Sequence, residues 1–235
     1  MFLRALAGLI AALTLVKAAD ITGTIVIERK LTRYNVTASA GLYQRGIAIP
    51  LGEDPSHDPI AFERSHVAVY LEGAADDSGV GLVQATIKQK DRRFIPDLLV
   101  VPVGSTVSFP NLDPIFHNIF SLSRTKSFDL GNYPMGQSRQ VTFARPGIVA
   151  VNCHLHTNMA ASIVVTPNRW RTRGVSDGTF VLKDVSPGTY TIVAWHRVAG
   201  TFTQKVQVVE GADAHVTFVI PYVAPEVPGK AVAHE

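Results

Sequence analysis

Hydrophobic and polar positions alternate in short runs along most of the chain, which is typical of β-strands that bury one face. The runs are rich in Val, Ile, Thr and Phe, and Pro, Gly, Asp and Asn separate them. Convincing helical periodicity is absent after the first eighteen residues. The pattern predicts an all-β protein with strands at 21–27, 67–71, 98–103, 105–109, 140–143, 148–151, 162–166, 179–182, 189–195, 204–209 and 215–220.

Two stretches break this rhythm. Residues 32–65 form a long irregular segment, which we interpret as a functional loop or as an insertion decorating the fold, because loops of this length are uncommon. Residues 224–235 contain two prolines and few apolar side chains, so they are expected to form a flexible tail.

The first eighteen residues have the features of a signal peptide. Arg4 gives a charged start, an apolar stretch of residues 5–16 follows, and Ala18 is the small residue that signal peptidase requires. We therefore expect cleavage after Ala18 or Ala19 and export to the periplasm. No later segment is long and apolar enough for a membrane helix, so no membrane span is expected.

Loss of residues 1–18 removes Arg4 and Lys17, which leaves 20 basic and 19 acidic residues and a formal net charge of +1. This near balance gives no argument for a nucleic-acid partner or an anionic membrane, and neither is expected.

The only cysteine, Cys153, lies in a short run that also holds His154, His156 and Met159. An exported protein with one cysteine has no internal disulfide, so the thiol is buried and inert, paired between chains, or bound to a metal. One thiolate, two imidazoles and a weak axial thioether are the ligands of a blue-copper site. His117 is the obvious supplier of the second imidazole, and the set predicts one mononuclear copper that alternates between Cu(I) and Cu(II).

Residues 84–167 resemble the cupredoxin family, of which plastocyanin is a member. The resemblance lies in the order of an upstream His117-Asn118, a strand that ends at Asn152, and Cys153, His156 and Met159 on one loop. It implies a Greek-key β-sandwich, with His117, Cys153, His156 and Met159 as copper ligands. It also implies that His117 lies on a strand adjacent to the one that ends at Cys153, and that the Asn118 side chain supports the cysteine loop by hydrogen bonding.

One departure from plastocyanin concerns the axial ligand. Two residues separate His156 from Met159, where plastocyanins typically have four, and shortening should change the axial distance. A similar compact loop occurs in bacterial exported proteins of the methylamine-utilisation-like subgroup. Side-chain alternation places His154 away from the metal, and Met135 is interpreted as a packing residue.

The segment from Val175 to Trp195 resembles the carboxypeptidase-regulatory, transthyretin-like sandwich. Asp177-Gly178 and Pro187-Gly188 are turn dipeptides between its alternating strands. Our hypothesis is a discontinuous sandwich of residues 20–83 with 168–222, into which the cupredoxin segment is inserted. Two consecutive domains are the alternative.

These features favour an exported carrier of single electrons that serves a transient redox protein partner, and not an enzyme. A dinuclear electron-transfer centre needs a second cysteine, and a trinuclear cluster needs further paired histidines, which the chain lacks. The alternatives are a copper-binding storage or delivery protein and a metal-free structural β-protein.

Overall fold

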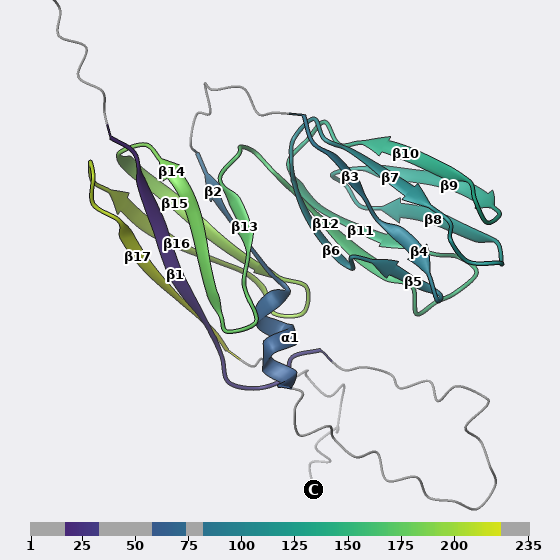
Figure 1. Cartoon of the computed structure of the whole chain (residues 1–235), viewed down its shortest axis with the longest axis horizontal. Helices are drawn as coiled ribbons and strands as arrows, with labels where there is room; N and C mark the ends of the chain where they lie inside the picture. Colours follow the sequence, from purple (N-terminus) through teal and green to yellow (C-terminus); the bar gives the residue numbers. More distant parts are fainter. Residues whose placement is uncertain (1–16, 33–57, 74–81, 222–235) are drawn as a thin grey trace, which may run out of the picture.

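The computed structural model describes residues 17–32, 58–73 and 82–221, and these residues fold into two β-sandwiches that appear as two lobes in Figure 1. The all-β class predicted from the alternating pattern is confirmed. The predicted signal peptide and the predicted C-terminal tail lie almost wholly outside the described residues.

The elements are β1 (Ala19–Ile27), α1 (Pro59–Ser65), β2 (Val67–Glu72), β3 (Gln84–Thr86), β4 (Lys88–Lys90), β5 (Arg93–Ile95), β6 (Leu98–Pro102), β7 (Thr106–Pro110), β8 (His117–Leu122), β9 (Ser127–Tyr133), β10 (Ser138–Thr142), β11 (Gly147–Asn152), β12 (Ala160–Thr166), β13 (Arg171–Arg173), β14 (Thr179–Val185), β15 (Gly188–His196), β16 (Gly200–Val208) and β17 (Ala214–Ile220).

The first sandwich packs a sheet of order β14-β1-β17 against a sheet of order β13-β2-β15-β16. In β1 every second residue is buried, as expected for a strand with one face on a core. β1 pairs antiparallel with β14 and parallel with β17, so the two ends of the described chain meet in one sheet. Buried aliphatic side chains and the rings of Phe180 and Phe218 fill the space between the sheets.

The second sandwich carries the cysteine and its neighbours. It consists of a sheet of order β10-β7-β3 and a sheet of order β6-β12-β11-β8-β9, with a β4–β5 hairpin beside them. Its core is continuous and includes Phe109, Tyr133, Phe143, Cys153 and Met159. The metal-ligating candidates are therefore attached to a packed interior.

The two cores use different parts of the chain. The core of the first sandwich draws on residues between Ala19 and Leu71 and between Trp170 and Ile220. The core of the second sandwich uses residues between Ile87 and Val165, which are contiguous in the sequence.

A short helix, α1, lies within the stretch of residues 32–65 that we predicted to be irregular. Asp58 caps it by accepting a hydrogen bond from the backbone N–H of Ile60, and Pro59 occupies the first turn, where its missing N–H costs nothing. The expectation that no helix follows the signal segment was therefore wrong at this point. The rest of the stretch, residues 33–57, lies outside the described residues.

A third, smaller cluster joins the two sandwiches. Ala68 and Trp195 of the first sandwich pack on Leu98 and Val164 of the second. The guanidinium of Arg173 donates to the carbonyl oxygen of Leu98 at 3.0 Å. Because this contact is apolar and buried, it holds the two sandwiches in a defined orientation.

An ion pair crosses the same interface. His66 Nε2 lies 2.8 Å from Asp97 Oδ1, and the ring of His66 stacks on Phe62 with centroids 3.8 Å apart. Burial alone would lower the pKa of His66, but the bonds to Asp97 and to the Phe62 carbonyl raise it above its ordinary value. Burial alone would raise the pKa of Asp97, but the hydrogen bond and the charge of His66 outweigh burial, so the pKa is lowered.

The stabilisation from this pair should depend on pH. The raised pKa of His66 means that its contribution is complete below about pH 6.5 and disappears as pH rises through the folded-state pKa. The lowered pKa of Asp97 means that its contribution is lost as pH falls through its own folded-state pKa. We expect Asp97→Asn to reduce the free energy of unfolding by at most about 1 kcal/mol near pH 6, because the pair is partly exposed. Urea denaturation of both proteins at several pH values checks this, and a difference that grows above pH 7 would contradict it.

Candidate metal centre

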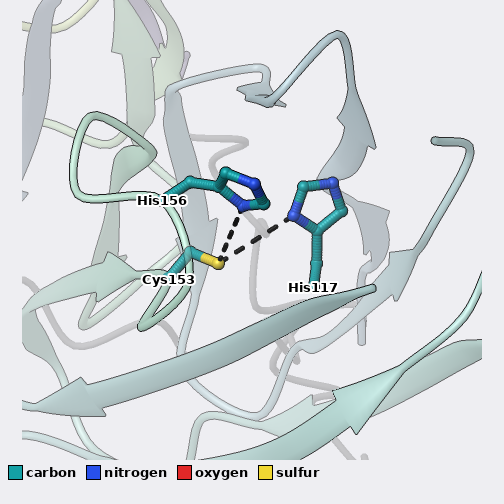
Figure 2. A group of neighbouring side chains, drawn as sticks. All are labelled: His117, Cys153 and His156. Atoms are coloured by element: carbon teal, nitrogen blue, oxygen red, sulfur yellow. Dashed lines mark hydrogen bonds between the residues drawn. The ribbon is translucent and has the colours of Figure 1, made fainter. Parts of the chain in front are cut away.

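The centre lies at one end of the second sandwich, where three side chains from two neighbouring strands and a loop converge (Figure 2). His117 is the first residue of β8, and Cys153 directly follows β11. β8 and β11 are adjacent in the five-stranded sheet, as the sequence predicts, and Asn152 pairs with Phe120 across them. His156 follows in the loop that leads to β12 and turns back toward the same point.

The distances between the three side chains match those of a metal-ligand set. Cys153 Sγ lies 3.9 Å from His117 Nδ1 and 3.8 Å from His156 Nδ1, and all three atoms lie within 4.8 Å of one another. Metal–sulfur and metal–nitrogen bonds of about 2.3 Å and 2.0 Å, at angles near 115°, place ligand atoms about 3.6 Å apart. Both sulfur–nitrogen distances lie within a few tenths of an ångström of this value.

The chemistry of these atoms also favours a cation. Both histidines direct Nδ1 at the sulfur. The sulfur and the two ring nitrogens each have a lone pair to offer when they carry no proton, and all three atoms lie within 4.8 Å of one another. A bound cation would accept the lone pairs of all three atoms.

The two histidines differ in exposure. His117 is fully buried at 0% exposure and Cys153 is 4% exposed, whereas His156 is half-buried. Burial, together with the nearby His117 ring, lowers the pKa of His156, which keeps its imidazole neutral and able to ligate at pH 7.

Met159 is buried at 1% exposure in the same core cluster as Cys153. Its backbone N–H donates to the His156 carbonyl oxygen at 3.0 Å, which closes the short ligand loop. The structure thus brings His117, Cys153 and His156 together and places Met159 in the core beside them. Ligation by its sulfur stays a prediction.

Asp113 holds His117 from the far side of the ring, a contact that we did not predict from the sequence. Its Oδ2 lies 2.8 Å from His117 Nε2, and the carboxylate is 5% exposed. The backbone N–H groups of Asp91 and Arg92, both with φ of 54°, donate to its two oxygens at 2.6 and 2.9 Å. Burial alone would raise the pKa of Asp113, but the bonds from these N–H groups and from His117 outweigh burial, so the pKa is lowered. An acid four residues before a candidate ligand is the signal that could have identified it.

The contact with Asp113 fixes the tautomer of His117. A carboxylate accepts from Nε2–H, so the lone pair of the ring is left on Nδ1, which faces Cys153. Such partners orient a ligating imidazole and increase its basicity.

The role predicted for Asn118 requires a correction. Its Nδ2 donates to Asp129 Oδ1 on β9 at 2.6 Å, and its buried Oδ1 has no hydrogen-bond partner among the described residues. Asp129 Oδ2 in turn lies 3.6 Å from His154 Nε2. The link from Asn118 to the cysteine loop therefore passes through two further side chains, because β9, which we did not predict, lies directly beside β8.

The other two predictions near the centre had different outcomes. His154 lies outside the three-residue group and stacks on Phe120, with ring centroids 3.7 Å apart. Met135 was interpreted as a packing residue, which was wrong because it is 59% exposed. It lies in the turn after β9, where the chain reverses at the surface.

Several solved structures resemble part of the chain at low identity. A copper-containing nitrite reductase from Thermus scotoductus SA-01 is 23% identical over 41% of this chain, with a TM-score of 0.36, and the match spans only 25% of the reductase. A purple cupredoxin from Nitrosopumilus maritimus is 24% identical over 35% of this chain and 99% of its own, with a TM-score of 0.32. A variant of amicyanin in its Cu(I) form is 19% identical over 41% of this chain and 97% of its own, with a TM-score of 0.33. No protein-family model and no curated protein sequence matches the chain.

Proposed function

We propose that the protein binds one copper ion and carries single electrons between redox partners. The observation that carries this proposal is the convergence of Cys153 Sγ on the Nδ1 atoms of His117 and His156 at 3.8 to 3.9 Å. One thiolate and two imidazoles form the trigonal set of blue-copper sites, and a buried thioether such as that of Met159 completes it. Structural zinc usually takes more Cys and His ligands and rarely Met, so zinc fits this donor set less well.

Copper held here would supply a one-electron change between Cu(I) and Cu(II). The chain supplies rigidity and exclusion of water. His117 and Cys153 are buried and attached to adjacent strands, and Asp113 holds the His117 ring in one tautomer. A site that is fixed in this way needs little rearrangement when its charge changes, which favours electron transfer over chemistry on a bound substrate.

The partner of such a carrier would dock around His156, whose ring is half-buried. Exposed apolar side chains occupy the segments that carry or flank the ligand residues: Leu112, Ile115, Phe116, Met135 and Leu155. A small, largely apolar surface suits a transient protein contact that forms and separates quickly, and the exposed Arg92 adds one positive charge near His156. Within the described residues no helix has the length and apolar character needed to cross a membrane, and a signal peptide at residues 1–18 would deliver the carrier to the periplasm.

We further propose that residues 84–167 form the copper domain and are inserted in a sandwich of residues 20–83 and 168–222. The buried core of each sandwich is built only from residues of its own part of the chain, which supports this division. Limited proteolysis that released a stable C-terminal fragment beginning near residue 168 would contradict it.

The direct test is to titrate the purified mature protein with Cu(II) and to record visible and EPR spectra. We expect one equivalent to produce an intense thiolate-to-copper band that a mild reductant bleaches reversibly. A Cu(I) chelator then separates the carrier from a storage or delivery protein. A carrier keeps its metal in both oxidation states, while a delivery protein loses Cu(I) to the chelator. Absence of a stoichiometric coloured complex would contradict copper binding of this kind.

Replacement of Asp113 by Asn should weaken copper binding and raise the reduction potential. The variant keeps the shape of the side chain but removes the negative charge that accepts from His117 Nε2. Loss of such a supporting group typically costs about 10- to 100-fold in metal affinity. The potential should rise because the carboxylate stabilises Cu(II) more than Cu(I).

Cyclic voltammetry and competitive copper titration measure these two quantities. Asp129→Asn is the matched control, because this carboxylate also lies near the centre but is exposed and bonds Asn118 instead of a ligand. Equal potentials in the Asp113 variant and the wild type would contradict the assigned role.

A further inference from the structure

We propose that the cavity between the two sandwiches is a binding site for a small organic anion with a flat apolar body, such as an aromatic carboxylate. The cavity has a volume of ≈ 930 Å³, close to the upper end of the range for small-molecule sites. Both sandwiches contribute to its wall, and clefts between domains are common ligand sites. The side chains that line it are Thr32, Phe62, His66, Arg93, Phe94, Ile95, Pro96, Asp97, Leu98, Thr157, Asn158, Ala160, Ser162, Trp195, His196, Arg197 and Val198.

The charged groups on this wall favour an anion. Arg93 and Arg197 are exposed side chains, and in the described parts of the chain neither forms an ion pair or a side-chain hydrogen bond. Asp97 is the one carboxylate on the wall; His66 Nε2 binds it at 2.8 Å, and the nearby charge of Arg197 also lowers its pKa. A guanidinium fork pairs with a carboxylate through two parallel hydrogen bonds, so the two exposed arginines fit this group.

His196 adds no negative charge and no free base to the site. Its Nε2 lies 3.1 Å from the buried carboxylate of Glu63. The backbone N–H groups of Val198 and Ala199 donate to its Nδ1 at 3.3 Å. Both ring nitrogens are therefore occupied, and the residue serves to shape the wall, which points to binding and not to catalysis.

The apolar part of the wall suits a flat ligand. Ile95 and Val198 expose apolar surface on the wall, at 44% and 55% exposure, while Phe94, Leu98 and Trp195 are at most 9% exposed and keep the wall rigid as parts of the packed interiors. Aromatic and aliphatic surface beside a few placed charges is the usual composition of a small-molecule pocket. The body of the ligand would lie on this surface while its carboxylate reaches the arginines.

The site also touches the metal centre through two segments. Thr157 and Asn158 lie between His156 and Met159 on the ligand loop. Arg93 opens β5 directly after the turn whose N–H groups hold Asp113. A bound anion would therefore contact both the loop that carries His156 and the hairpin that fixes the partner of His117.

The test uses the full mature protein without copper, so that its result is independent of the proposed electron-transfer function. Benzoate is the probe, and benzamide is its uncharged analogue. Isothermal titration calorimetry gives the affinity, and fluorescence locates the site, since Trp195 lines the cavity while Trp170 lies in the core of the first sandwich. Arg93→Gln and Arg197→Gln remove the charges, and Arg145→Gln is a matched control, because its exposed guanidinium bonds two carbonyl oxygens of the second sandwich.

We expect saturable benzoate binding with a change in tryptophan fluorescence, at least tenfold weaker in each arginine variant and unchanged in Arg145→Gln. Benzamide should not bind. Three results would overturn the proposal: no saturable binding of benzoate up to about 10 mM, equal affinity in the arginine variants, or equal binding of benzamide. In the copper-loaded protein, a benzoate-dependent shift of the reduction potential would show that the two sites are coupled.

Discussion

Cys153→Ser should abolish the intense visible band of the copper-loaded protein and reduce copper affinity by more than about 100-fold. Loss of a residue that only supports a ligand already costs up to about 100-fold, and loss of a ligand should cost more. The reason is that the thiolate is the one strong anionic donor among the three converging side chains, and a serine hydroxyl stays protonated at neutral pH. Visible and EPR spectra of the variant, titrated with Cu(II), check this.

The matched control for this variant is His154→Gln. His154 directly follows Cys153, but it stacks on Phe120 and lies outside the three-residue group. The band should therefore survive in this variant with nearly the same intensity. Equal loss in the two variants would mean that the whole loop matters for shape, and would contradict the assignment of Cys153 as the ligand.

Gly23→Ala should strongly destabilise the first sandwich. Gly23 faces inward on β1, and a Cβ there would lie less than 3.0 Å from the ring of Phe180 and from the carbonyl oxygen of Val216. The second contact is with backbone on β17, so a rotamer change cannot relieve it. We expect a loss of about 3 kcal/mol in the free energy of unfolding, at the upper end of the usual cost of overpacking.

Urea denaturation of the copper-free protein measures this loss. Gly136→Ala serves as the control, because nothing lies within 4 Å of the added Cβ and only the positive φ of 82° opposes it. That strain should cost about 1 kcal/mol. Equal stability losses in the two variants would show that the close approach of β1 to β17 is not decisive.

The sequence predicted the ligand candidates because their chemistry is local. Cys153 and His156 lie three residues apart, and side-chain alternation sets His154 aside, which leaves His117 as the other histidine of residues 84–167, so no long-range packing had to be known. The alternating runs were enough for the strongly patterned strands such as β1 and β17. Both rules depend only on residue types and spacing.

The missed features depend on tertiary contacts. β9 reads as a turn because Asp129, Gly131 and Asn132 interrupt its apolar positions, and it becomes a strand through its pairing with β8. The partner of Asn118 could not be predicted without that strand. Helix α1 has seven residues, too few for a periodic pattern. Asp113 reaches His117 because the 91–92 turn holds its carboxylate, and the sequence signals the pair only through the spacing of four residues.

The interleaved use of the chain by the two cores determines the order in which the protein can be completed during synthesis. The strands of the second sandwich are contiguous from Gln84 to Thr166, so this half can fold once that stretch is available. β1 must wait for its parallel partner β17, and Asp20 reaches Asp213 across 193 positions of the chain. The N-terminal strands thus leave the ribosome first and find their partners last, while the half with the metal ligands can mature early.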